Sequence, residues 1–212
     1  MFDELVSNLL APRQCSAAHE TAKKHESKRF AAVMALISDQ PEPDLLFTER
    51  SSKLNNHAGQ ISFPGGSKDP ADGNPLVTAL RETDEEIGLG LELVEPLGAL
   101  PAGDVPVSSF HVCPIVGLWS GFETLTPNLA EVKAVYRWKI EDLRNPNNRV
   151  TWALDGRLGG PAWVFGELFL WGFTAGVVDA ILKAGGWSQP WDDGRVMEVP
   201  ERFGHPRASR RS

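Results

Sequence analysis

Short apolar runs, many of them alternating with polar residues, recur along the chain and are bounded by turn-forming residues. Such runs are typical of β-strands when clusters of Gly, Pro, Asp or Asn flank them. We therefore predict strands at residues 30–38, 45–50, 59–63, 91–100, 110–119, 131–140, 150–154 and 161–165. The first two runs are separated by the turn-rich stretch DQPEPD, so we expect them to form a hairpin.

A helical period is clearest between Pro75 and Ile87. The positions on its apolar side recur at about 100° per residue; they are Leu76, Val77, Leu80, Thr83 and Ile87. Asn74 can cap the start of this helix, Pro75 suits its first position, and Gly88 can end it. Further helical segments are predicted at residues 3–10, 141–145 and 167–186.

The order of these elements predicts one α/β domain built on a mixed β-sheet, with one helix in the middle of the chain and another near its end. Residues 1–28, a short helix followed by a polar loop, are expected to be part of the same unit. Residues 29–186 are expected to form the main domain. Residues 187–212 are expected to be a C-terminal extension with a partly disordered tail.

Composition narrows the classes of function. The 212 residues carry a formal net charge of −7, and the basic residues are scattered, which argues against a nucleic-acid groove. No run approaches the roughly 18 apolar residues of a membrane span, and the start lacks the pattern of a signal peptide. The two cysteines lie far apart, so we expect no disulfide framework and a cytoplasmic location. An anionic ligand would then need a bound cation to attract it.

The stretch RETDEEIGL concentrates negative charge near the end of the predicted helix. On a helical wheel, Glu82, Glu85 and Glu86 point away from the apolar side, within one arc of roughly 100°. A solvated acidic face is one interpretation. However, like charges four residues apart and acids at a helix C-terminus are both unfavourable. A hard divalent ion would compensate them, and the Gly65-Gly66 turn could add a backbone oxygen to its ligands.

The same stretch resembles the Nudix box, whose core reads R-E-apolar-x-E-E-x-G-apolar. The matching residues are Arg81, Glu82, Glu85, Glu86, Gly88 and Leu89. Thr83 stands where the family prefers an aliphatic residue. The acid upstream of the box, Asp72, lies one position further from Arg81 than the common spacing requires. That shifted form resembles the coenzyme A pyrophosphatase branch of the family.

A second stretch, LFTERSSKLNNHAGQISFPGG at 46–66, is similar to the signature of the same branch. Matches are found at Thr48, Arg50, Ser51, Gly59 and the run Phe63-Pro64-Gly65-Gly66. Asn55 stands where the signature has arginine, and an amide does not replace a cation beside a phosphate-rich ligand. Residues 108–117 and 170–175 also resemble this branch, so the resemblance runs from about residue 30 to residue 183.

The resemblance implies a Nudix-type α/β/α sandwich with a mixed sheet. It also implies hydrolysis of coenzyme A or acyl-coenzyme A to 3',5'-ADP and (acyl-)4'-phosphopantetheine, with Mg²⁺ or Mn²⁺ as cofactor. Catalytic roles are implied for Arg81, Glu82, Glu85, Glu86 and Glu131, substrate contacts for Arg50, Ser51, Gly65 and Gly66, and metal contacts for Gly66, Glu82, Glu85 and Glu86. Arg81 would orient a helix carboxylate by a charged hydrogen bond.

Several alternatives remain open at this point. Arg50, Arg81, Glu131 and Glu123 are also compatible with ordinary surface positions, and the general base is not identified. The substrate could instead be ADP-ribose, NADH or another nucleoside diphosphate derivative, or the fold could bind a nucleotide without turnover. The expected partner is a small nucleotide, with no nucleic acid and no membrane, and the sequence leaves a homodimer open.

Overall fold

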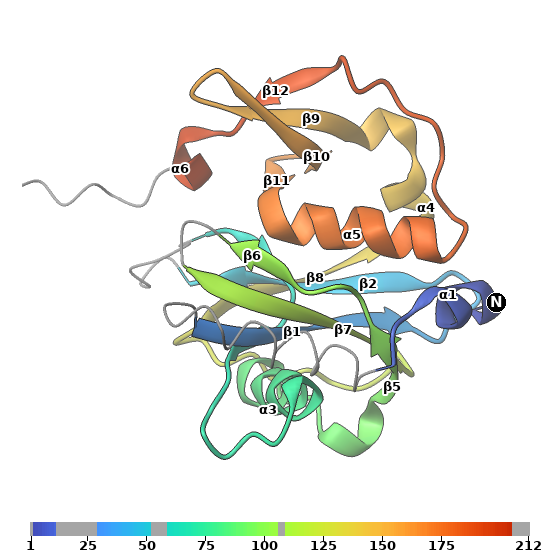
Figure 1. The fold of residues 1–212 in the computed structure, drawn as a ribbon, viewed down its shortest axis with the longest axis vertical. Helices are drawn as coiled ribbons and strands as arrows, with labels where there is room; N and C mark the ends of the chain where they lie inside the picture. Colours follow the sequence, from blue (N-terminus) through green and yellow to red (C-terminus); the bar gives the residue numbers. More distant parts are fainter. Residues whose placement is uncertain (1, 12–28, 52–58, 106–108, 205–212) are drawn as a thin grey trace, which may run out of the picture.

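The computed structural model describes residues 2–11, 29–51, 59–105 and 109–204, which form two β-sheets and the helices packed on them (Figure 1). The larger sheet contains β1 (Arg29–Ser38), β2 (Asp44–Arg50), β3 (Ile61–Ser62), β4 (Gly65–Ser67), β5 (Glu95–Ala99), β6 (Gly103–Val105), β7 (Phe110–Trp119) and β8 (Val132–Lys139). The smaller sheet contains β9 (Arg149–Leu154), β10 (Arg157–Phe165), β11 (Leu168–Leu170) and β12 (Val196–Glu198). The helices are α1 (Asp3–Asn8), α3 (Pro75–Ile87), α4 (Ile140–Arg144), α5 (Gly172–Ala184) and α6 (Glu201–Gly204), with 3-10 turns η1 (Leu91–Leu93) and η2 (Pro146–Asn148).

Strands β1 and β7 form the centre of the larger sheet. They are parallel over their whole length, whereas β2, β4, β5, β6 and β8 pair with their neighbours in the antiparallel sense. Strand β1 is buried on both faces, which explains why its sequence is a nearly continuous apolar run. Ala35 and Ile37 face the cluster that includes α5, and Met34 and Leu36 face the cluster that includes α3. The predicted mixed sheet is thus confirmed.

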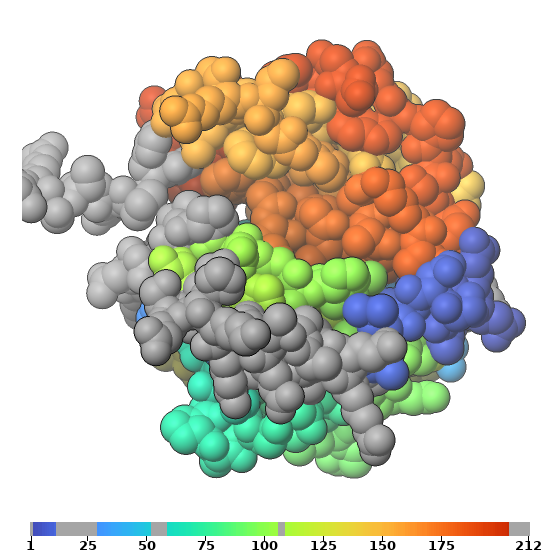
Figure 2. Space-filling view, in the orientation of Figure 1, coloured from blue at the N-terminus to red at the C-terminus, as the bar shows by residue number. Residues whose placement is uncertain are grey.

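The two helices of the sandwich lie on opposite faces of the larger sheet. Figure 1 shows α3 on one side, while α5 lies on the other side between the two sheets. Val178, Ile181 and Leu182 of α5 are fully buried in the same cluster as Leu45 and Phe47 of β2. The space-filling view shows α5, in orange, packed directly against the strands below it (Figure 2). This cluster joins the two sheets and holds the larger sheet as a rigid support for α3.

Some predicted elements differ from the observed ones. The segment 167–186 is not one helix, because Leu168–Leu170 pair with β10 as β11 and the helix begins only at Gly172. The segment 91–100 divides into η1 and β5, and strand 59–63 shrinks to β3. The described residues form two sheets rather than one, and strand β12 was not predicted. The β1–β2 hairpin is confirmed.

Two expectations from composition can be compared with the structure. In the described part of the chain, no helix is both long and apolar enough to cross a membrane. The expectation of no disulfide framework is wrong, because Cys113 on β7 is disulfide-bonded. The other cysteine, Cys15, falls outside the described residues, as do the polar loop predicted before β1 and the last residues of the tail.

Candidate active site

Local sequence fixes the helix that carries most of the candidate residues. The Asn74 side chain accepts a hydrogen bond from the Val77 N–H at 3.1 Å, and Pro75 occupies the first helical position. Gly88 ends the helix with φ 67°, a conformation that glycine adopts without strain. The predicted bounds of α3 are therefore confirmed at both ends.

The buried side of α3 is rotated from the predicted one. Val77, which was predicted on the buried side, is 42% exposed, whereas Thr78 and Ala79, which were not, are fully buried. Thr83 is fully buried, as predicted. The Thr83 hydroxyl donates to the Ala79 carbonyl at 2.7 Å, so a polar residue is tolerated where the Nudix pattern prefers an aliphatic one. The rotation also brings Glu86 inside, with an exposed fraction of only 3%. The prediction that the three acids all point away from the core is thus wrong for Glu86.

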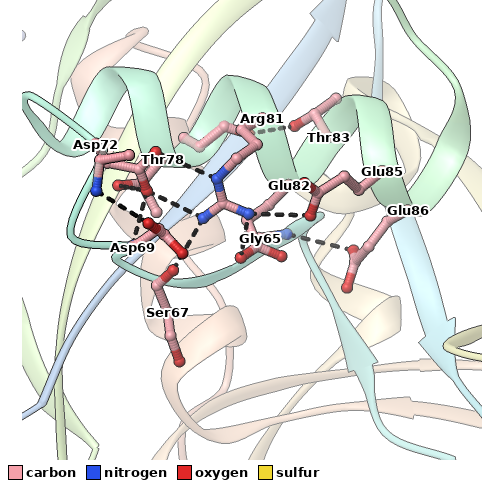
Figure 3. A network of polar contacts seen from close by, with 12 residues as sticks. Gly65, Ser67, Asp69, Asp72, Thr78, Arg81, Glu82, Thr83, Glu85 and Glu86 are labelled. Carbon is pink, nitrogen blue, oxygen red and sulfur yellow. Dashed lines mark hydrogen bonds and ion pairs between the residues drawn. The ribbon is translucent and has the colours of Figure 1, made fainter.

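Arg81 is the centre of a polar network that joins α3 to the loop before it (Figure 3). Its Nε and Nη2 donate to the two carboxylate oxygens of Asp72 at 3.2 and 3.0 Å. Its Nη2 also donates to the Ser67 carbonyl at 3.0 Å. On the other side, its Nη1 lies 3.0 Å from Glu82 Oε1 and 2.9 Å from Glu85 Oε2. One guanidinium therefore links the loop before the helix to two of the three helix acids.

Asp72 is held by more donors than Arg81 alone provides. Its Oδ2 also accepts a hydrogen bond from the Asp69 N–H and one from the Thr78 hydroxyl, both at 2.9 Å. These bonds favour the charged form, and those from Arg81 contribute most, so the pKa of Asp72 is lowered to about 2. The acid that is offset by one position in the sequence thus still reaches Arg81 with both oxygens.

Glu86 has the opposite surroundings. Its Oε2 accepts a hydrogen bond from the Gly65 N–H at 3.3 Å, and its Oε1 lies 3.8 Å from Arg50 Nη1. Burial dominates these contacts and raises the pKa of Glu86 to about 7, and the charges of Glu82 and Glu131 add to the rise. Burial also raises the pKa of Glu82. The positive charge near the C-terminal end of α3 therefore does not balance the negative charges of Glu82 and Glu86.

The two glycines before the helix form β4 rather than a tight turn alone. Strand β4 pairs with β1, which places Gly65 opposite Val33 and Gly66 opposite Ala32. A Cβ on Gly65 would lie 2.4 Å from the Ala32 carbonyl oxygen. A Cβ on Gly66 would lie 2.4 Å from the Glu82 carboxylate. Only glycine therefore allows this strand to lie between β1 and the acids of α3.

The donor set fits a hard divalent cation. It consists of three carboxylates within one turn and a half of helix, with a glycine backbone pressed against one of them. Carboxylate and backbone oxygens are the ligands that Mg²⁺ and similar ions prefer. Within the described ranges, no three His, Cys, Asp or Glu side chains already converge as a metal cage, and Arg81 holds Glu82 and Glu85. The raised pKa values of Glu82 and Glu86 nevertheless show that added positive charge would stabilise both carboxylates.

Comparison with known proteins identifies this arrangement. Residues 28–152 match the NUDIX domain, which is more than half of the chain. This chain belongs to the Nudix hydrolase family. The matched range includes β1, the two glycines, α3 and the strands that support them, so the helix acids described above are those of the Nudix box.

Several relatives carry the name uncharacterized Nudix hydrolase NudL. The protein from Yersinia enterocolitica is 41% identical over 159 residues, which cover 72% of this chain and 79% of the relative. The protein from Klebsiella pneumoniae is 35% identical over 170 residues and covers 72% and 80%. Among solved structures, a NUDIX hydrolase from Alicyclobacillus acidocaldarius is 20% identical, covers 74% of this chain and 91% of its own, and has a TM-score of 0.46.

Other residues singled out from the sequence are placed as follows in this Nudix hydrolase. Arg50 lies at the end of β2 and faces Glu86, and its Nε is buried without a partner among the described residues. Ser51 is 5% exposed, and its N–H donates to the Glu131 carbonyl at 2.7 Å. Glu131 is exposed just before β8. Glu123 accepts from the Ser120 hydroxyl at 2.7 Å, past the far end of β7.

Sequence reasoning missed part of the site. Thr78 was not singled out, and its hydroxyl supports Asp72 from within the helix. Asn128, in the loop before β8, was also missed, although its N–H donates to the carbonyl of Glu86 at 2.9 Å. No sequence motif marks either residue, because each acts through a contact that only the fold creates. Asn55, where the branch signature has arginine, lies outside the described residues.

Proposed function

We propose that this Nudix hydrolase cleaves the pyrophosphate of coenzyme A or acyl-coenzyme A and releases 3',5'-ADP and (acyl-)4'-phosphopantetheine. The proposal is supported by the resemblance of residues 46–66 to the signature of the coenzyme A pyrophosphatase branch and by the shifted position of Asp72. We further propose a cytoplasmic location, for which the disulfide at Cys113 removes the support that the cysteine content gave.

One observation carries the proposal: the branch signature and the Nudix box meet at a single carboxylate. Arg50 and Gly65 both belong to the signature stretch, and Glu86 belongs to the box. Arg50 Nη1 lies 3.8 Å from one oxygen of Glu86, and the Gly65 N–H donates to the other oxygen at 3.3 Å. A signature unrelated to the chemistry would have no reason to surround the most deeply buried acid of the box.

The residues would divide the task between holding a cation and holding the substrate. Glu82, Glu85, Glu86 and the Gly66 carbonyl would hold Mg²⁺ or Mn²⁺. When bound, such an ion neutralises the pyrophosphate oxygens and acidifies water. Arg81 would orient Glu82 and Glu85, because its Nη1 already contacts both carboxylates. Arg50, next to Ser51 and the two glycines, would contact a phosphate oxygen, since its Nε has no partner among the described residues.

Product analysis on a small panel tests the substrate. The purified protein is incubated with Mg²⁺, and separately with Mn²⁺, in the presence of coenzyme A, acetyl-coenzyme A, ADP-ribose or NADH. Release of 3',5'-ADP from the first two compounds, with little product from the others, is the expected result. AMP from ADP-ribose or NADH alone would overturn the coenzyme A assignment and retain the Nudix chemistry. No product in any reaction would favour a nucleotide-binding module without turnover.

A thermal shift tests the metal site independently of turnover. Because a divalent ion would bind the folded acids and not the unfolded chain, it should stabilise the fold by mass action. We expect millimolar Mg²⁺ to raise the Tm of the wild-type protein and to raise that of Glu86→Gln by much less. An equal rise in both proteins would show that the ion binds elsewhere.

A further inference from the structure

The backbone of Arg50 is paired with a short piece of chain at the edge of the larger sheet. Strand β3 consists only of Ile61–Ser62, and in the described part of the chain it pairs only with β2. Two hydrogen bonds extend this pairing to Arg50. Its N–H donates to the Gln60 carbonyl and its carbonyl accepts from the Gly59 N–H, both at 3.0 Å. A hairpin end with so few pairs opens readily unless other contacts hold it.

Such contacts come from α6, near the other end of the chain. Gln60 Nε2 donates to the Phe203 carbonyl at 2.9 Å, across 143 positions of sequence. The edge of the Phe203 ring faces Gly59, since a Cβ added to Gly59 would lie 4.0 Å from Phe203 Cε1. Both residues that pair with the backbone of Arg50 therefore adjoin Phe203.

Phe203 is itself anchored on the smaller sheet. Its exposed fraction is 6%, and it belongs to a buried apolar cluster. The other buried members of that cluster are Val150, Ala162, Phe169 and Val199. The chain reaches α6 through β12, which is parallel to β9 (Figure 1). Arg202 of α6 also donates to the Glu167 carbonyl, just before β11. Because α6 is fixed in these ways, it can restrain the residues that it contacts.

The side chain of Arg50 has few contacts that would fix its direction. Its Nη1 lies 3.8 Å from Glu86 Oε1, which is longer than a hydrogen bond, and its Nε has no partner among the described residues. The direction of the guanidinium therefore depends on the backbone that carries it. That backbone is held by Gly59 and Gln60, and α6 contacts both.

We propose that α6 positions Arg50 for the substrate, with Phe203 holding Gln60 and Gly59 and these two residues fixing the backbone of Arg50. Strand β12 and α6 lie outside residues 28–152, which match the NUDIX domain, so the C-terminal segment adds this restraint to the family fold. The inference rests on the proposed function in that Arg50 contacts a phosphate oxygen. It does not depend on which nucleotide is the substrate. Gln60 and Phe203 are positioning residues and are assigned no contact with the substrate.

Gln60→Met tests the restraint without changing the charge of the site. Methionine keeps the length of the side chain but cannot donate to the Phe203 carbonyl. We expect KM to rise by about tenfold and kcat to stay within about twofold of wild type, because a displaced Arg50 loses a contact made equally to substrate and transition state. Gln40→Met is the matched control. The Gln40 amide donates to the Ser120 carbonyl in the turn before β2, so its loss should leave KM unchanged.

The background Arg50→Ala separates positioning from a purely structural role. With no guanidinium to displace, Gln60→Met should cause no further rise in KM in this background. An equal further rise would overturn the proposal, and so would a wild-type KM for Gln60→Met alone. The rates are measured with the panel compound that the wild-type protein hydrolyses best. Failure of coenzyme A as substrate would therefore affect only the proposed function.

Hydrogen exchange at the Arg50 and Gly59 amides needs no turnover. In the metal-free protein without substrate, Gln60→Met should speed the exchange of both amides by about fivefold, because the hairpin end opens more readily. Gln40→Met should leave both unchanged. Unchanged exchange in Gln60→Met would overturn the proposal even for a protein that hydrolyses nothing. Faster exchange together with a wild-type KM would also overturn it, since the hairpin would then open without displacing Arg50.

Discussion

The two carboxylates at opposite ends of the α3 network are both almost inaccessible to solvent, but Glu86 lies deeper in the protein and has fewer partners than Asp72. Asp72 is 5% exposed and Glu86 is 3% exposed. Asp72 accepts four hydrogen bonds, two of them from the Arg81 guanidinium. Glu86 accepts one bond at 3.3 Å and has its nearest cation, Arg50, at 3.8 Å. The pKa of Asp72 is about 2, whereas that of Glu86 is about 7.

The difference separates an acid that the fold has already compensated from one that it has not. A buried charge costs stability unless hydrogen bonds and ion pairs compensate it. Asp72 is compensated, so it stabilises the fold and fixes Arg81. Glu86 is left short of positive charge, and such sites are where functional groups gather. We therefore propose that Asp72 serves mainly the structure of the site and that Glu86 serves the reaction.

The strongest test of this difference is Glu86→Gln. The substitution keeps an oxygen for the Gly65 N–H and removes the charge that would bind a cation or accept a proton. We expect kcat/KM to fall by about 100-fold or more, which is typical for loss of an acid-base group. The metal-free protein should lose no stability, because an uncompensated buried charge has been removed. Kinetics and urea unfolding measure the two effects on the same preparation.

Asp84→Asn is the matched control for that substitution. Asp84 lies on the same helix, is exposed, and differs from Glu86 chiefly in its surroundings. Removing the Asp84 charge should leave the rate within about twofold of wild type, because an isolated surface charge contributes little to the energetics of the protein. Equal losses in the two variants would show that the helix needs its total charge and not the particular carboxylate of Glu86.

Asp72→Asn should lower the stability of the protein clearly and the rate less than Glu86→Gln does. The asparagine keeps one oxygen and turns an NH₂ group toward donors from Arg81, Asp69 and Thr78. We expect a loss of about 1.5–3 kcal/mol in the free energy of unfolding, the range for hydrogen bonds to charged groups. The rate should fall by about tenfold, through displacement of Arg81. A large rate loss without a loss of stability would contradict the structural role of Asp72.

The contrast between the two acids also shows how far the sequence alone can predict this site. The bounds of α3 follow from Asn74, Pro75 and Gly88, which are all local to the helix, so they could be predicted residue for residue. The motif positions of Arg81 and the helix acids follow from spacing in the same way. Interactions between residues within one or two helical turns depend only on neighbouring sequence, so they can be predicted from residue spacing.

The burial of Glu86 could not be predicted in this way. It depends on β4, whose pairing with β1 joins segments some thirty residues apart. It depends also on the loop between β7 and β8, whose Thr126 and Asn128 N–H groups donate to the carbonyls of Ile87 and Glu86. A helical wheel takes no account of contacts from outside the helix, so it predicted that all three acids point into solvent. The missed strand β11 has the same cause, since pairing with β10 overrides the helical tendency of that stretch.

The two acids predict opposite pH dependence of stability in the metal-free protein. The folded-state pKa of Glu86 is raised from 4.5 to about 7, so its protonated form stabilises the fold and that contribution is lost as pH rises through about 7. The folded-state pKa of Asp72 is lowered from 3.8 to about 2, so its contribution is present above pH 3.8 and is lost as pH falls through about 2.

Urea unfolding of wild type, Glu86→Gln and Asp72→Asn between pH 2 and pH 8 measures both effects. Wild type should lose stability relative to Glu86→Gln as the pH rises from 4.5 through 7. Its advantage over Asp72→Asn should instead shrink as the pH falls from about 4 to 2. Parallel curves for all three proteins would show that neither carboxylate changes its pKa on folding. A chelator must be present throughout, because a bound cation would stabilise the charged form of Glu86.

Thr78→Val should have the smallest effect and tests how fully Asp72 is compensated. Valine has the shape of threonine, so the fully buried site should repack without a cavity, and one of four hydrogen bonds to Asp72 is lost. Because Arg81 and the Asp69 N–H still hold the carboxylate, we expect a loss of about 1 kcal/mol in the free energy of unfolding. The rate should stay within about twofold of wild type, since Arg81 keeps both of its bonds. Thr78→Ser retains the hydroxyl and should keep that hydrogen bond. A rate loss in Thr78→Val as large as that in Asp72→Asn would mean that the Asp72 end also controls the reaction, and the division between the two ends would no longer hold.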